Sequence, residues 1–132
     1  MKEKIKEKNH TSAQDFQYFK KRCLYWQEQL GLGQWEIYFS HIDLIDKRAI
    51  SSWQIGARKA TITLSVDWGE DKEINPINDE QLNRSALHEM LHILLAGLES
   101  YCDFYASWLI EREEHVIINH LLHAILKKID QK

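Results

Sequence analysis

The sequence lacks the features that mark membrane proteins and disulfide-rich proteins. None of its apolar runs approaches the roughly 18 residues that a membrane-spanning helix needs, and the amino terminus has no hydrophobic signal core. Its only two cysteines, Cys23 and Cys102, lie far apart and match no CxxC or CxxH pattern, which argues against a disulfide framework and against a zinc ribbon. We therefore expect a cytoplasmic protein with no membrane partner.

The chain also has little net charge, −3 at pH 7, so composition provides no general argument for binding nucleic acid. Its only basic concentration is at the start, where four lysines between positions 2 and 8 alternate with glutamates. We interpret residues 1–11 as a flexible lysine-rich tail and do not expect nucleic acid as a partner. With 132 residues, of which 44% are hydrophobic and 28% charged, the rest of the chain (12–132) is expected to form one globular domain.

Hydrophobic periodicity predicts a helix, three short strands and two further helices. The first helix covers residues 13–30; Ser12 or Thr11 caps it together with Asp15, and the glycines of segment 31–33 end it. Alternating apolar residues predict strands at 35–40, 50–55 and 61–66, of which the last two form an antiparallel hairpin.

The second half of the chain is expected to be helical. A polar segment, 67–77, holds the only proline and is interpreted as a surface loop. Asn78 then caps a helix that ends at Gly97, and a last helix runs from about 103 to 128. This order predicts an α+β domain with its helices packed on one face of the sheet.

The helix after Asn78 carries the sequence His88-Glu89-Met90-Leu91-His92, an HExxH motif. Residues four apart lie on one face of a helix, so both imidazoles can bind one metal ion with Glu89 beside them. Apolar side chains surround the motif on nearly every side, which is typical of a buried central helix. Buried histidines and glutamates need partners, and one zinc ion with its bound water would satisfy all three.

A third zinc ligand is expected from the last helix. At 100° per residue, Glu114 falls near the middle of the apolar arc of that helix, where a carboxylate is costly unless it binds a metal or a partner. Glu114 is therefore the predicted third ligand, with Glu111 as the runner-up. His115 and Asp103 are alternatives, as is a site without a third protein ligand.

His88-Glu89-x-x-His92 followed by an acidic ligand on the next helix resembles the zincin metallopeptidases, in particular their glutamate-ligand branch, the gluzincins. The small size and the Glu113-Glu114-x-x-x-x-Asn119 run are similar to small zincin-like metallopeptidases of bacteriophages and prophages. The chain departs from the phage-immunity metallopeptidases at 118–122, which lacks their Ala-Asn-x-Phe-Ala run. The resemblance implies a minimal zincin-like domain in a bacterial host or phage-infected cell.

The resemblance further implies a zinc-dependent peptidase with one Zn²⁺ per chain and a protein or peptide as substrate. Glu89 would act as general base on a zinc-activated water, and the strand at 60–66 would be the sheet edge that pairs with the substrate. An oxyanion donor is normally a His, Tyr or Arg, and the candidates are Tyr101, Tyr105 and His115. The alternatives are a non-catalytic or regulatory zinc-binding module of phage type, a non-peptidase metal hydrolase, and an α+β interaction protein without metal.

Overall fold

The computed structural model describes residues 9–69, 77–100 and 107–130, and it has the predicted α+β class. Three helices and a three-stranded sheet follow one another in the expected order. Their bounds are α1 Ala13–Gln29, β1 Glu36–Ile42, β2 Ala49–Gln54, β3 Lys59–Ser65, α2 Asp79–Ser100 and α3 Ser107–Asp130. In the described residues, no helix is long and apolar enough to cross a membrane.

Local side-chain hydrogen bonds start two of the helices where the sequence predicts. Ser12 and Asp15 form a reciprocal capping box at the start of α1, in which each side chain bonds the backbone N–H of the other residue. Asn78 Oδ1 accepts a hydrogen bond from the Gln81 backbone N–H at 2.9 Å and so caps α2. Gly31, at a φ of 71°, provides the left-handed turn after α1.

The sheet has the strand order β1-β3-β2 and is mixed. β2 and β3 form the predicted antiparallel hairpin, whereas β1 pairs with β3 in parallel. The prediction that segment 60–66 is a sheet edge is therefore wrong, because β3 lies in the middle of the sheet. The hydrophobic pattern of a strand indicates that the strand is buried but not which strands pair with it, and β3 is indeed mostly buried. The edge strands are β1 and β2.

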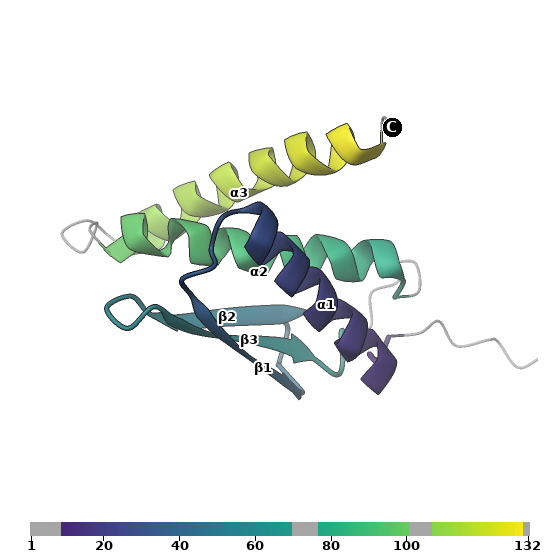
Figure 1. The fold of residues 1–132 in the computed structure, drawn as a ribbon. Helices are drawn as coiled ribbons and strands as arrows, with labels where there is room; N and C mark the ends of the chain where they lie inside the picture. The colour runs from purple at the N-terminus through teal and green to yellow at the C-terminus, as the bar shows by residue number, and fades with distance from the viewer. Residues whose placement is uncertain (1–8, 70–76, 101–106, 131–132) are drawn as a thin grey trace, which may run out of the picture.

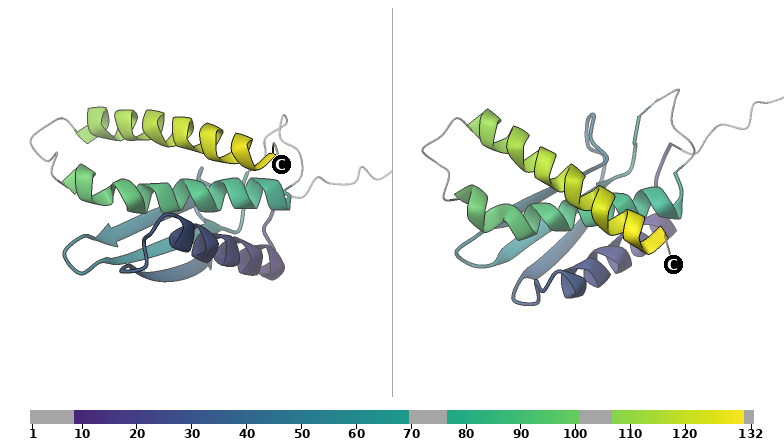
Figure 2. Two further views of the ribbon diagram at one scale, coloured as in Figure 1. Left: turned by 45° about the horizontal axis from the view of Figure 1, so that its top comes forward. Right: turned by 90° about the horizontal axis from the view of Figure 1, so that it is seen from above.

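The helices form layers on one side of the sheet. Figure 1 and Figure 2 show α1 and α2 side by side over the sheet, with α3 lying across the outer side of α2. α2 is thus the central element, and both faces of its motif region are covered. The core between these layers consists of buried apolar side chains from α1, β3, α2 and α3, among them Phe19, Cys23, Ile62, Leu64, Leu82, Leu87, Met90, Leu91, Ile93, Ile118 and Leu122.

Several element boundaries differ from the prediction, most of them by one or two residues. α2 does not end at Gly97 but continues to Ser100. A glycine inside a helix costs about 1 kcal/mol relative to alanine, yet the helix continues past Gly97, next to the buried Ala96. The first part of the expected tail and residues 103–106 of the last helix lie outside the described residues. Within the tail, the Thr11 N–H donates to the Val66 carbonyl, so the packed chain begins before Ser12.

Candidate metal centre

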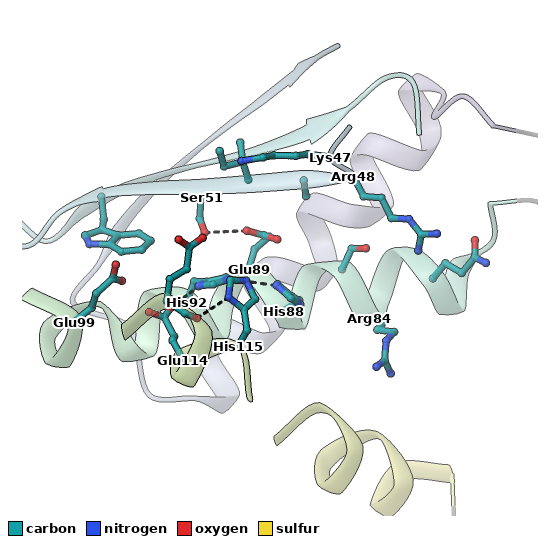
Figure 3. Close-up of a pocket in the computed structure, with 16 residues that line it drawn as sticks. Lys47, Arg48, Ser51, Arg84, His88, Glu89, His92, Glu99, Glu114 and His115 are labelled. Carbon is teal, nitrogen blue, oxygen red and sulfur yellow. Dashed lines mark hydrogen bonds and ion pairs between the residues drawn. The ribbon is translucent and has the colours of Figure 1, made fainter. Parts of the chain in front are cut away.

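The HExxH motif lies on α2 in a cleft beside β2 and the start of α3. Figure 3 shows His88 and His92 on the same side of α2, with His115 of α3 beside them. The Nε2 atoms of His88 and His92 are 3.2 Å apart. The motif therefore has the predicted geometry, in which residues four apart on a helix present two imidazoles to one point.

His115 completes a group of three imidazoles. Its ring centroid is 5.8 Å from that of His88 and 5.0 Å from that of His92. One ligand atom from each of the three side chains lies within 4.8 Å of those of the other two, close enough to hold a metal ion. We call His88, His92 and His115 the three-histidine cluster. Among the described residues, it is the group of His, Cys, Asp and Glu side chains with this geometry.

The outer nitrogens of two of these rings have partners on α3. His92 Nδ1 is hydrogen-bonded to the Glu114 carboxylate, and His115 Nδ1 donates to the Glu111 carbonyl oxygen at 2.8 Å. A carbonyl oxygen accepts only, so Nδ1 of His115 carries a proton, and Nε2 is the nitrogen that can bind a metal. Metal-binding histidines characteristically have such a carboxylate or carbonyl partner, which orients the ring and fixes its tautomer.

Burial keeps the two motif histidines neutral. It is the largest cause that lowers the pKa of His88 and of His92 to about 4, and the neighbouring imidazoles act in the same direction. A metal ligand must offer an unprotonated nitrogen, so neutral rings need lose no proton near pH 7. Three imidazoles with an open cleft beside them fit the donor set of a catalytic zinc site.

Glu89 is the buried carboxyl group of the motif, with only 6% of its surface exposed. Burial raises its pKa to about 7, although the hydrogen bond from Ser51 lowers it in part. Ser51 Oγ donates to Glu89 Oε1 at 2.9 Å and thereby holds the carboxyl group against β2 (Figure 3). A carboxyl group with a pKa near 7 can both accept and return a proton at neutral pH.

The cleft that contains these groups has a volume of about 580 Å³. β2 forms one wall through Ser51 and Trp53, and the Trp53 ring stacks toward His92 at a centroid distance of 6.5 Å. Further side chains at its two ends are Lys47, Arg48, Arg84, Glu99 and Glu111. Sequence reasoning had not assigned Ser51, Arg84 or Glu99 to the site, since only the packing of β2 against α2 brings them together.

The remaining predicted site residues have different places. Glu114 is 7% exposed, as its position in the apolar arc implied, but its carboxylate contacts the outer nitrogen of His92 and it is not part of the three-histidine cluster. Its role as third ligand stays a prediction. Glu111 lines the cleft. Tyr101, Tyr105 and Asp103 lie outside the described residues, and His115, predicted as an oxyanion donor or alternative ligand, lies in the cluster.

Comparison of the chain with protein-family models, with curated proteins and with solved structures finds no match. The evidence on function therefore comes from the geometry of the site.

Proposed function

We propose that this protein is a zinc-dependent peptidase. The observation that supports this most strongly is a buried Glu89 carboxyl group in the same cleft as three converging imidazoles. Hydrolysis catalysed by a metal ion requires two components together. One is a set of ligands that leaves a coordination position open, and the other is a general base next to that position. The HExxH spacing on α2 is in addition the arrangement found in zincins.

The three-histidine cluster would hold the metal, with His115 in place of the predicted Glu114 as the third ligand. Two contacts support this choice, the Glu114 carboxylate on His92 Nδ1 and the Glu111 carbonyl on His115 Nδ1. Both rings then direct Nε2 toward the metal. Zinc bound there would acidify a water molecule and polarise the carbonyl group of the substrate.

The protein's own side chains would move the proton. Glu89, in its ionised form, accepts the proton of the attacking water and later returns it to the leaving amine, for which a pKa near 7 is suitable. Ser51 positions Glu89 through its hydrogen bond to Oε1. Because that bond involves one carboxylate oxygen, the other oxygen can face the water.

A peptide substrate fits the cleft because its wall is the free edge of a sheet. The Ser65 N–H donates to the Arg48 carbonyl, so the backbone of every second residue after Arg48 also faces β3. The intervening residues Ala49, Ser51 and Trp53 therefore direct their N–H and C=O groups to the free edge of β2, and all three line the cleft. An extended polypeptide can add to this edge as a further strand.

The test is elemental analysis followed by peptide digestion. Wild-type protein should contain one zinc per chain and cleave an unfolded protein substrate, whereas Glu89→Gln should keep the zinc and lose turnover. Glu113→Gln serves as a control because Glu113 is exposed on α3. Stoichiometric zinc without cleavage of any substrate would favour a non-catalytic zinc module instead. Absence of bound metal in zinc-supplemented preparations would favour an interaction protein.

A further inference from the structure

The cleft has basic side chains toward one end and carboxyl groups toward the other. Lys47 and Arg48 precede β2, and Arg84 lies one helical turn before His88 on α2. Figure 3 shows Arg48 and Arg84 toward one end of the cleft and Glu99 toward the other, with the histidines and Glu89 between them; the Lys47 side chain extends along β2 toward Glu89. A substrate that follows β2 would therefore meet basic groups on one side of the reacting centre and carboxyl groups on the other.

The basic side chains have no carboxylate partners among the described residues. No ion pair within 4.0 Å connects Lys47, Arg48 or Arg84 to an Asp or Glu in that part of the chain. The guanidinium group of Arg48 does stack over the Trp68 ring, with Cζ 5.0 Å from the ring centroid, which restrains the group while the N–H groups in its plane can still donate hydrogen bonds. Within the described part of the chain these three cations have no carboxylate partner, and together they form a site for an anionic group.

The charges are close enough to act on the catalytic centre. The positive charge of Arg84 is one of the causes, after burial and the neighbouring imidazoles, that lower the pKa of His88. The charge of Lys47 likewise lowers the pKa of Glu89, against the larger raising effect of burial. An anion bound at this end would thus lie near the scissile bond and not at a remote surface.

The direction of β2 decides which part of a substrate lies there. β2 runs from Ala49, beside the basic end, to Gln54. Antiparallel pairing is slightly more stable than parallel pairing, so a substrate strand on the free edge is expected to run in the opposite direction. Its amino-terminal half then lies near Trp53 and Glu99, and its carboxyl-terminal half extends toward Arg48 and Lys47.

We propose that the cleft selects polypeptides with an acidic residue on the carboxyl-terminal side of the scissile bond. At about 3.4 Å per residue, the three-residue offset between Ser51 and Arg48 places that acidic residue roughly one to four positions after the cleavage point. Lys47, Arg48 and Arg84 are the specificity-determining residues. On the other side the cleft offers Glu99 and Glu111, which provide no cation to pair with an acidic residue. Burial and the neighbouring Glu114 raise the pKa of Glu99 to about 7. This inference rests on the proposed peptidase function.

The test is a digest of a randomised synthetic peptide library by the zinc-loaded full-length protein, with the cleavage products sequenced by mass spectrometry. We expect Asp and Glu to be enriched after the cleavage point and depleted before it. For a matched pair of peptides with Asp or Asn at the selected position, kcat/KM should be about fivefold higher for Asp, the upper range for one partly exposed ion pair.

Substitutions then assign the preference to the basic end. Arg84→Gln combined with Arg48→Gln should reduce the ratio of kcat/KM for the Asp peptide over the Asn peptide to about 1, and Arg84→Glu should favour Lys at that position. Lys21→Gln, an exposed residue on α1, is the charge-matched control and should keep the wild-type preference. Raising the salt concentration should weaken cleavage of the Asp peptide selectively.

The outcomes separate this inference from the proposed function. Cleavage without an acidic preference, or with the preference before the cleavage point, overturns the inference while the peptidase stands. If no peptide is cleaved, the peptidase proposal fails, and binding of the Asp and Asn peptides to Glu89→Gln protein, measured by fluorescence anisotropy, decides the inference. Equal affinity for the two peptides, or no binding of either, contradicts it.

Discussion

His92 of α2 and His115 of α3 each use one ring nitrogen for a hydrogen bond to α3, and the other ring nitrogen faces the cleft. His92 bonds Glu114 and His115 bonds the Glu111 carbonyl, both through Nδ1. The two buried carboxyl groups also have different partners, since Glu114 contacts His92 while Glu89 contacts Ser51. Residue type alone does not distinguish a ligand from the group that orients it; the atom that each side chain contacts does.

This distinction predicts different losses of zinc affinity. His115→Ala removes a ligand and should abolish stoichiometric zinc binding at micromolar metal. Glu114→Gln removes an orienting partner and should weaken binding by roughly 10- to 100-fold. The measurement is competition with a chromophoric zinc chelator, with Glu113→Gln as the exposed control. If Glu114→Gln loses the metal while His115→Ala retains it, Glu114 is the third ligand after all.

The buried thiol of Cys23 is expected to make the stability of the protein depend on pH above about 9. Burial is the largest cause that raises its pKa well above the ordinary value of 9.0, and the charge of Glu89 adds to it. Between the unfolded and the folded pKa the native state binds more protons than the unfolded state, so the free energy of unfolding falls as the pH rises above about 9. Below that pH the contribution is fully present.

The measurement is denaturant unfolding of wild type and Cys23→Ala at pH 7 and pH 10. The variant should be less stable at pH 7, by roughly 1–2 kcal/mol for a small buried side chain, yet should lose less stability between the two pH values. Tyrosine and lysine titration affects both proteins equally and cancels in the difference. Parallel losses in the two proteins would contradict the prediction.

At the scale of elements, the helix starts are determined by nearby residues. The capping box of Ser12 and Asp15 satisfies backbone N–H groups at the start of α1, and Asn78 does the same for α2. The strand pairing depends on more distant contacts. β2 and β3 are joined by a short hairpin, whereas the paired strands β1 and β3 are separated in the sequence by all of β2.

Ser12→Ala should therefore destabilise the protein by about 1 kcal/mol, the usual cost of losing a side-chain cap. The loss should appear as a lower midpoint in a urea unfolding curve with an unchanged slope. Gln17→Ala, at an exposed position within α1, is the control and should change stability little. An effect of Ser12→Ala no larger than that of the control would mean that the capping box contributes nothing measurable.

At the scale of the whole molecule, a metal held by the three-histidine cluster would connect α3 to α2. His88 and His92 lie on α2 and His115 on α3, while α3 lies across the outer side of α2 and away from the sheet (Figure 2). α3 also exposes large apolar side chains such as Trp108, so its packing on α2 covers only part of its surface. Metal binding is thus expected to contribute to the attachment of this helix.

Removal of zinc should consequently lower the melting temperature. A ligand present at 100 times its Kd stabilises the folded state by about 2.7 kcal/mol, which corresponds to roughly 10 °C for a chain of this size. Calorimetry with and without a chelator measures the shift, and hydrogen exchange should increase first in α3. The variant His88→Ala/His92→Ala should not respond to the chelator; an equal response would show that the effect arises elsewhere.

The sequence by itself determined the parts of this protein that depend on local spacing. Those parts are the helix caps at Ser12 and Asn78, the β2–β3 hairpin, the shared face of His88 and His92 and the burial of Glu114, since each follows from residues within a few positions of one another. Only the tertiary structure decided that β3 is central, that Ser51 holds Glu89, and that His115 joins the motif while Glu114 contacts His92. These contacts link separate elements, and their geometry depends on how α2 packs between β2 and α3, which no local pattern specifies.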